Sequence, residues 1–506
     1  MLRDNEFDRE LLSRVMPNGF TNPEPSSPYN LVVVGAGTAG LVAASGAAQL
    51  GARVALIERT AMGGDCLNVG CVPSKSLLRS AHAVAEIRRA EELGIRVHGR
   101  VEVDFGAVMD RMREIRARIA PNDSVARFRD ELGVDVFLGE GRFTDRQVIE
   151  VGDQKLEFRR ALIATGARAR IPEIPGLDQI DYLTNETIFD LETQPEHLLV
   201  LGGGPIGCEL AQAFCRLGSR VTVVEADQQF LPREDPDAAQ SLLESFQKDG
   251  IDVRLATRLE AVEIGADGAH QAKLANAKTS DVVVFDRLLV AVGRSPNVEE
   301  LGLEEAGIDY DTERGVHISD TFQTRNPAVY AAGDVCLPHK FTHAANFAAR
   351  AVIQNALFSV GPLGKKKWST LTVPWCTYTD PEIAHVGLSE QEAGERGQQL
   401  DSFTCEFADV DRAIAESRDD GFVRIHLEHG RDRIVGATVV APNAGDLISE
   451  ICVAMEAGMG LSGLASVIHP YPTRAEAIRQ TGDARNRTRL TPLAGRLLEG
   501  YLRWRR

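Results

Sequence analysis

The 506-residue sequence has no run of about 18 consecutive apolar residues, so it predicts no transmembrane helix. Its first residues, Met-Leu-Arg-Asp-Asn-Glu, are acidic and polar and lack the apolar core of a secretory signal. It has no excess of basic residues either, since the formal net charge is −17, which disfavours nucleic acid and anionic membranes as partners. We therefore expect a cytoplasmic protein with no nucleic acid bound and no membrane insertion.

Cysteine is scarce: the eight cysteines are too few for a disulfide scaffold in a chain of this length. Two of them nevertheless lie close together in Gly-Gly-Asp-Cys66-Leu-Asn-Val-Gly-Cys71-Val-Pro-Ser-Lys75, just before a predicted helix over residues 76–93. On a regular helix, five residues rotate by about 500°, so the two side chains would point about 140° apart. A disulfide between them requires a distorted backbone, which the surrounding glycines permit.

A thiolate near the start of a helix is also stabilised by the helix dipole. We interpret Cys66 and Cys71 as a redox-active pair. A metal half-site and two unpaired buried cysteines are the alternative interpretations.

A glycine-rich turn precedes the cysteine pair. A strand over residues 31–34 is followed by Gly35-Ala-Gly37-Thr-Ala-Gly40, an apolar helix, and a second strand that ends at Glu58. Gly35 makes the tight turn, Gly37 lets a pyrophosphate approach the backbone, and Gly40 lets the helix pack on the strand. The helix N-terminus binds phosphate, and Glu58 accepts hydrogen bonds from ribose hydroxyls. This full context predicts a dinucleotide-binding site.

The same pattern recurs 167 residues later. Gly202-Gly-Gly204-Pro-Ile-Gly207 follows a strand over residues 198–201, and Glu225 corresponds to the first acidic residue. Two dinucleotide sites imply two dinucleotides, and the simplest chemistry between them is hydride transfer from a nicotinamide to a flavin. Because the cysteine pair directly follows the first site, we expect the flavin there.

The rest of the chain divides around these repeats. Residues 1–29 contain several prolines and predict an extended arm, either packed on the surface or disordered. Small-residue turns at 162–166 and 288–293 suggest chain crossings between the two nucleotide domains, and 361–368 predict a linker to the last domain. Residues 490–506 predict a basic amphipathic helix, which we expect to pack on the protein rather than to bind a membrane.

These motifs make residues 30–485 resemble the class I pyridine nucleotide–disulfide oxidoreductases, and most of all the mercuric reductases, then the dihydrolipoamide dehydrogenases. The resemblance implies an α/β fold with two Rossmann-like dinucleotide-binding domains and an α+β C-terminal dimerisation domain. The implied boundaries are an arm at 1–29, a discontinuous FAD-binding domain at 30–165 and 291–360, an NAD(P)-binding domain at 166–290, and a dimerisation domain with a C-terminal helix at 370–506.

The resemblance also implies roles for single residues. Cys66 would meet the substrate, Cys71 would face the flavin, and Lys75 would lie near the flavin and pair with Glu209. FAD would be held by Gly35, Gly37, Gly40, Glu58, Thr165, Gly166 and Asp334. The nicotinamide nucleotide would be held by Gly202, Gly204, Gly207, Glu225 and Gly293. In a homodimer, Tyr471 and Glu476 would complete the active site of the partner subunit.

Two departures from the family bear on the acceptor. The disulfide-reducing members have a histidine where this chain has Tyr471, and a tyrosine with a pKa of about 10 is a poor base near neutral pH. Mercuric reductases resemble this chain there, and a metal ion held by thiolates needs no such base. However, no cysteine follows Cys452 to deliver Hg(II), as a C-terminal pair does in those enzymes. His469 would share a strand face with Tyr471 and is a weaker candidate for the missing base.

We therefore expect an FAD-dependent oxidoreductase that passes electrons from NAD(P)H through Cys66 and Cys71 to Hg(II) or another thiophilic metal ion. Reduction of a small disulfide, as by dihydrolipoamide dehydrogenase, or of a quinone is one alternative, and a redox-sensing flavoprotein without turnover is another. Glu225 favours NADH over NADPH, because its charge would repel a 2′-phosphate. No structural metal site is expected, although Cys66 and Cys71 could hold Hg(II) transiently.

Overall fold

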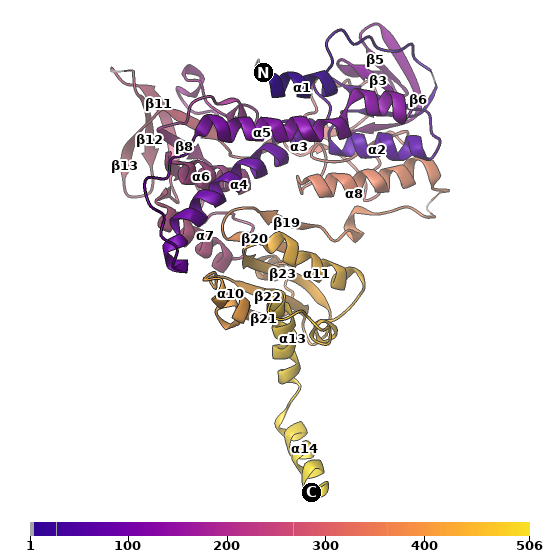
Figure 1. Cartoon of the computed structure of the whole chain (residues 1–506). Helices are drawn as coiled ribbons and strands as arrows, with labels where there is room; N and C mark the ends of the chain where they lie inside the picture. Colours follow the sequence, from indigo (N-terminus) through magenta and orange to yellow (C-terminus); the bar gives the residue numbers. More distant parts are fainter. Residues whose placement is uncertain (1–4, 27, 267, 362) are drawn as a thin grey trace.

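The computed structural model describes residues 5–26, 28–266, 268–361 and 363–506, and its first body is a seven-stranded sheet (Figure 1). Strands β3, β2, β1 and β6 run parallel in that order, with β18 beside β6, and β5 and β4 extend the sheet with antiparallel pairs. Their bounds are β1 Tyr29–Val34, β2 Val54–Glu58, β3 Asp135–Leu138, β4 Gly141–Asp145, β5 Val148–Val151, β6 Gln154–Ile163 and β18 Val329–Ala331. The sheet thus combines strands from residues 29–163 with one strand from residues 329–331.

Two helices lie side by side against this sheet, α2 (Thr38–Gln49) and α8 (Thr342–Ile353) (Figure 1). Both are rich in alanine, and a helix with small side chains can approach a sheet and another helix closely. This packing brings the start of α2, after the first glycine turn, and the start of α8 to the same edge of the sheet.

The N-terminal arm differs from the extended chain that its prolines predicted. Residues Glu6–Val15 form helix α1, capped by Asn5, whose side chain accepts a hydrogen bond from the Asp8 backbone N–H. Leu11 and Val15 are fully buried in the core of the first domain, and this apolar face is the reason why the segment folds.

The second nucleotide unit repeats the first on a smaller scale. Its parallel sheet has the order β10-β9-β8-β14, with α6 and α7 packed on it, and a three-stranded antiparallel sheet, β11-β12-β13, adjoins it. The bounds are β8 His197–Leu201, α6 Pro205–Leu217, β9 Arg220–Val224, α7 Pro236–Asp249, β10 Asp252–Arg254, β11 Arg258–Ile264, β12 His270–Ala275, β13 Ser280–Phe285 and β14 Arg287–Val290. The chain crosses between the two units where β7 (Ala167–Ala169) pairs with β15 (Arg294–Pro296), close to the predicted crossings.

Three helices connect the two units: α3 (Gly64–Asn68), α4 (Cys71–Arg88) and α5 (Phe105–Ile119). The helix predicted from residue 76 therefore begins five residues earlier, at Cys71. Between α3 and α4, Gly70 adopts φ −139° and ψ −111°, and a Cβ there would lie 2.8 Å from the carbonyl oxygen of Asp65. The predicted distortion between the two cysteines is present, and it depends on this glycine.

The last domain is an antiparallel sheet of order β19-β20-β23-β22-β21 covered by α11 and α13, which confirms its α+β class. Its bounds are β19 Pro374–Thr377, β20 Glu382–Gly387, α9 Glu390–Glu395, β21 Leu400–Glu406, α10 Asp411–Ala415, β22 Phe422–Glu428, β23 Ile434–Ala441, α11 Ala444–Glu456, α12 Leu461–Ala465 and α13 Glu476–Thr488. A short hairpin in the first body, β16 (Tyr310–Asp311) with β17 (Gly315–Val316), completes the strands.

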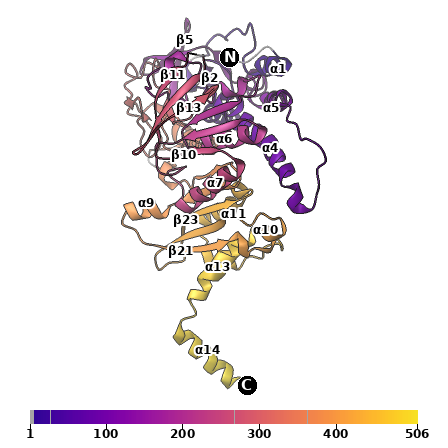
Figure 2. The same cartoon turned by 90° about the vertical axis from the view of Figure 1, so that its left-hand side faces the viewer.

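The final helix, α14 (Pro492–Trp504), extends away from the body in both views (Figures 1 and 2). It has no buried residue, so the expected packing against the protein is absent within one chain. None of the helices in the described ranges is long and apolar enough to cross a membrane.

Candidate functional site

One continuous cavity of about 2120 Å³ joins the two nucleotide units. Both glycine turns, both cysteines of the predicted pair and the N-terminal ends of α2, α4, α6 and α8 border it. Several helix N-termini that face one cavity make a favourable environment for anionic groups, because each carries partial positive charge and free N–H donors.

The first glycine turn is closely packed on one side and open to the cavity on the other, as a pyrophosphate site requires. A Cβ at Gly35 would collide with the carbonyl oxygen of Ala164, and one at Gly40 would collide with that of Gly35. These two glycines are therefore required by the backbone packing. Gly37, by contrast, borders the cavity, where it meets only the backbone of Gly64.

The second turn repeats this arrangement. A Cβ at Gly202 would lie 2.5 Å from the carbonyl oxygen of Ala291, and one at Gly207 would collide with that of Gly202. A Cβ at Gly204, in contrast, would meet no described atom within 4 Å, and this glycine borders the cavity. Both turns thus have the close packing and the open face that a bound dinucleotide requires.

The acidic residues at the ends of the second strands are held by backbone donors. Glu58 accepts hydrogen bonds from the N–H groups of Ala36 (2.7 Å) and Thr60 (2.9 Å). Glu225 accepts from Gly203 (2.6 Å) and Asp227 (2.8 Å). Both carboxylates border the cavity and retain lone pairs for ribose hydroxyls, as their predicted roles require.

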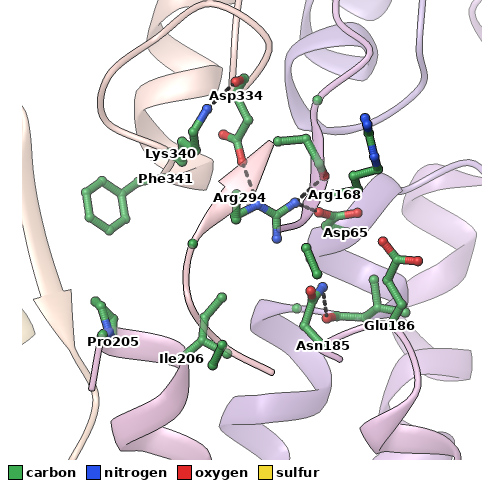
Figure 3. Close-up of a pocket in the computed structure, with 18 of the residues that line it drawn as sticks. Asp65, Arg168, Asn185, Glu186, Pro205, Ile206, Arg294, Asp334, Lys340 and Phe341 are labelled. Carbon is green, nitrogen blue, oxygen red and sulfur yellow. Dashed lines mark hydrogen bonds and ion pairs between the residues drawn. The ribbon is translucent and has the colours of Figure 1, made fainter. Parts of the chain in front are cut away.

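Asp334 belongs to a charged cluster that borders the cavity (Figure 3). Its carboxylate faces Arg294 at 3.5 Å, and Arg294 also pairs with Asp65, the residue before Cys66. Lys340 donates a hydrogen bond to the Asp334 carbonyl oxygen at 2.6 Å. Burial raises the pKa of Asp334, although the charges of Arg294 and Lys340 act against this rise.

Thr165 and Gly166 lie beside the segment at β15 where the chain returns to the first nucleotide unit. The Thr165 hydroxyl donates to the carbonyl oxygen of Asn297 (2.7 Å), and the Asn297 side chain donates to that of Thr165 (2.9 Å). Gly166 and Gly293 both have positive φ, at 70° and 117°, which lets the chain turn sharply at the cavity wall. Both border the cavity, as do the other predicted nucleotide-binding residues except Gly40 and Gly207, which pack against the backbone behind each turn.

The two cysteines come together across the break between α3 and α4. Their side chains hydrogen-bond to each other, and the Cys71 sulfur lies 3.2 Å from the hydroxyl oxygen of Thr342, the first residue of α8. Cys71 is also the first residue of α4, so its sulfur is next to a helix N-terminus. The structure therefore places the thiols where a disulfide could form and break, at the junction of three helices.

The two thiols have opposite acid strengths. The hydrogen bond from Cys66, with further help from Thr342 and the charge of Lys75, lowers the pKa of Cys71 to about 6, against the opposing effects of desolvation and of the Glu209 charge. The same hydrogen bond and burial raise the pKa of the Cys66 thiol. In the reduced state, Cys71 is therefore the more acidic of the two thiols.

Lys75 pairs with Glu209 of α6, as predicted, with 2.7 Å between Nζ and Oε2. Burial would lower the pKa of the Lys75 ammonium, but the attraction of Glu209 raises it above its ordinary value. Glu209 also accepts a hydrogen bond from the backbone N–H of Tyr378, whose ring lies 4.6 Å from the Lys75 ammonium. Glu209 thus keeps the Lys75 ammonium charged and fixed in position beside the thiols.

Tyr471 and Glu476 lie in the last domain and do not border this cavity in a single chain. Tyr471 is exposed and donates a hydrogen bond to Asp411 at 2.6 Å, whereas Glu476 accepts one from Arg479 at 2.8 Å. His469 does not lie on a strand, contrary to the expectation for it, and its Nε2 is 2.7 Å from Glu450.

Several residues of the site were not singled out from the sequence. Thr342, Arg294 and Asp65 make contacts that depend on the meeting of distant segments, so no local pattern marked them. Two arginines, Arg233 and Arg258, border the cavity near the second nucleotide site, and the second follows Glu225 by 33 residues. Their positive charge would attract a 2′-phosphate, so Glu225 by itself is a weaker argument for NADH over NADPH.

The comparisons with known proteins agree with this architecture. The family described as pyridine nucleotide-disulphide oxidoreductase matches residues 29–354, and its dimerisation domain matches residues 373–481. A mercuric reductase from Lysinibacillus sphaericus is 34% identical over 89% of this chain and 81% of its own length. A dihydrolipoyl dehydrogenase from Thermus scotoductus is 34% identical over 90% of this chain and 97% of its own.

Among solved structures, the Cu(II) complex of the HOCl-induced flavoprotein disulfide reductase RclA from Escherichia coli is similar, with a TM-score of 0.78 and 28% sequence identity. The likeness covers 89% of this chain and 98% of that one. The fold, the two nucleotide units and these matches lead to one conclusion: the chain belongs to the pyridine nucleotide-disulphide oxidoreductases, a family of FAD-binding enzymes that use pyridine nucleotides.

Proposed function

We propose that this protein reduces a thiophilic metal ion, with Hg(II) as the first candidate, at the expense of NAD(P)H. The overall reaction is NAD(P)H plus Hg(II) giving NAD(P)⁺, H⁺ and Hg(0), so that two electrons and one proton leave the nicotinamide. The observation that carries the proposal is the position of Cys66 and Cys71 in one cavity with both nucleotide turns. Thiolates are the preferred ligands of soft metal ions.

Some of these residues would bind the two nucleotides, and others set the charge beside the thiols. FAD would be held by the first turn with Glu58, Thr165, Gly166 and Asp334, and the nicotinamide nucleotide by the second turn with Glu225 and Gly293. FAD, when bound, supplies the means of passing a pair of electrons between nicotinamide and thiols. The charge of Lys75 favours the thiolate form of Cys71, whereas the charge of Glu209, its ion-pair partner, opposes it.

The choice of a metal ion over a disulfide rests on Tyr471. Its hydrogen bond to Asp411 raises the pKa of Tyr471 further above its ordinary value, so it is a poor proton acceptor for a substrate thiol. Two comparisons point in the same direction, because several relatives are named mercuric reductases and a structural neighbour forms a Cu(II) complex. A metal ion bound by thiolates needs no base at that position.

The proposed site is completed by a second copy. The last domain matches the dimerisation domain of the family, and Tyr471 and Glu476 are remote from the cavity of their own chain. In a homodimer they would lie at the acceptor side of the other subunit's thiols. We propose NADH as the favoured nucleotide because Glu225 borders the cavity, although Arg233 and Arg258 border it as well.

The test is release of elemental mercury by the purified flavoprotein, supplied with NADH and with Hg(II) as its complex with excess thiol. Turnover in the wild type, together with its loss in Cys66→Ala, would support the proposal. Absence of release from a protein that still binds FAD and is still reduced by NADH would refute the metal-ion acceptor.

A second candidate is the reduction of a small disulfide or the oxidation of a small dithiol, as in dihydrolipoamide dehydrogenase. The observation in its favour is the dihydrolipoyl dehydrogenase relative, which matches as well as the mercuric reductases do. The same preparation, assayed with dihydrolipoamide and NAD⁺, separates the two candidates. Steady turnover with dihydrolipoamide and none with Hg(II) would favour the second.

A further inference from the structure

Helix α1 is tied to the segment that carries the two cysteines by a buried chain of polar contacts. Asp8 of α1 and Arg116 of α5 form an ion pair at 2.8 Å, with both side chains at most 1% exposed. Arg116 also donates a hydrogen bond, again at 2.8 Å, to the carbonyl oxygen of Asn68. Asn68 is the last residue of α3 and lies between Cys66 and Cys71.

Arg116 joins the two ends of this chain of contacts, because its guanidinium uses separate nitrogens for the two partners. Nη2 faces Asp8 and Nη1 faces Asn68. Asn5 supports Asp8 with a second hydrogen bond at 2.7 Å, and the charge of Arg113 lies 3.9 Å away. The arginine is therefore held between the N-terminal helix and the cysteine segment, by one contact of 2.8 Å to each.

Asn68 in turn holds the backbone on the N-terminal side of Cys66. Its side-chain amide donates to the carbonyl oxygens of Met62 (3.1 Å) and Gly64 (2.9 Å). A second tie joins the other end of α1 to the same segment, since the backbone N–H of Met62 donates to the carbonyl oxygen of Val15 at 3.1 Å. Both ends of α1 thus fix the segment from residue 62 to residue 68.

A fixed segment matters for this cysteine pair, because no single continuous helix sets the spacing of the two residues. The break at Gly70 leaves the two sulfurs on separate helices, α3 and α4. A disulfide requires Cβ atoms about 3.8 Å apart, so the effective concentration of one thiol at the other depends on how firmly α3 is held.

We propose that helix α1 is a positioning element of the redox centre, which acts through Asp8 and Arg116 on the Asn68 carbonyl and so keeps Cys66 and Cys71 close enough to form a disulfide. This inference rests on the proposed redox function of the two cysteines. In the couple concerned, the disulfide takes up two electrons, and one proton for each sulfur that is protonated at the pH of the measurement. Asp8 and Arg116 are positioning residues, because neither borders the cavity.

The test is the dithiol–disulfide equilibrium of the pair, measured on the full-length flavoprotein in dithiothreitol redox buffers. The reduced fraction is read from the mass increase of the peptide with Cys66 and Cys71 after alkylation, so flavin reduction does not interfere. Asp8→Asn removes the negative charge that pairs with Arg116, and Arg116→Lys keeps the positive charge but cannot reach both partners. In both variants we expect the disulfide to be about tenfold easier to reduce, which corresponds to about 30 mV.

Two further variants separate positioning from stability. Glu10→Gln changes an exposed charge on the same helix and should leave the equilibrium unchanged. Asp8→Leu combined with Arg116→Met replaces the buried ion pair with apolar groups, a change that often restores stability. We expect this double variant to recover the melting temperature but to keep the shifted equilibrium, because it lacks a donor for Asn68.

Wild-type equilibria in both Arg116→Lys and the double variant would overturn the role of α1. Absence of any dithiol–disulfide couple in the wild-type protein would overturn the proposed redox function and this inference together. If the wild type shows a dithiol–disulfide equilibrium and the variants show the same one, this inference alone would be overturned.

Discussion

The hydroxyl of Thr342 should control the acidity of Cys71. Its oxygen lies 3.2 Å from the sulfur, and the first turn of α8 holds it there. Valine has nearly the same shape as threonine but has no hydroxyl. Thr342→Val therefore removes one donor to the thiolate and leaves Cys66, Lys75 and the helix dipole of α4 in place.

The size of the effect follows from the strength of that bond. A hydrogen bond to a charged group contributes about 1.5–3 kcal/mol, and a change of 1.36 kcal/mol moves a pKa by about one. From the wild-type value of about 6, we expect the pKa of Cys71 to rise to about 7 or 8 in the variant. At pH 7 the thiolate fraction should fall from about nine-tenths to between about one-tenth and one-half.

The assay is the rate of alkylation of the reduced protein by iodoacetamide between pH 4.5 and about 9.5, a range wide enough to include the ordinary cysteine pKa. Mass spectrometry of the peptide that contains Cys66 and Cys71 assigns the fast reaction to one sulfur. Thr342→Ser keeps the hydroxyl and serves as the matched control. An alkylation midpoint in Thr342→Val that stays within about 0.3 pH units of the wild type would refute the reasoning, since it would correspond to less than about 0.5 kcal/mol.

Three further substitutions test the rest of the site. Gly40→Ala should abolish FAD retention, because the added Cβ would collide with the carbonyl oxygen of Gly35. The FAD content is measured as flavin absorbance after gel filtration, and a normal content would contradict the packing argument. Glu225→Arg should raise kcat/KM for NADPH relative to NADH by at least about tenfold, as about 1.4 kcal/mol of altered charge interaction requires; an unchanged ratio would mean that Glu225 does not face the ribose. Tyr471→His should increase dihydrolipoamide turnover, measured as NADH formation, if this position supplies the proton acceptor, and flat turnover would place the block elsewhere in the acceptor pocket.

Local sequence patterns were sufficient for the two nucleotide units. The glycines of each turn, the strand before it and the acidic residue after it are short-range features, and their spacing reflects backbone contacts such as that of Gly40 with Gly35. Resemblance to the family supplied the partner of Lys75, which local patterns could not. The same patterns misjudged the N-terminal arm, where prolines after residue 16 obscured the amphipathic helix α1 before them.

The sequence by itself determined the α/β class, the duplicated turn and the proximity of two cysteines to a helix start, because each depends on residues near one another in the chain. Only the tertiary structure decided which thiol is acidic, since Thr342 is 271 residues from Cys71 and lies beside it through the packing of α8 on α2. It also decided that Asp8 and Arg116, 108 residues apart, reach the cysteine segment. Contacts of this kind require the free energy of a whole buried core to hold them, and no local spacing records them.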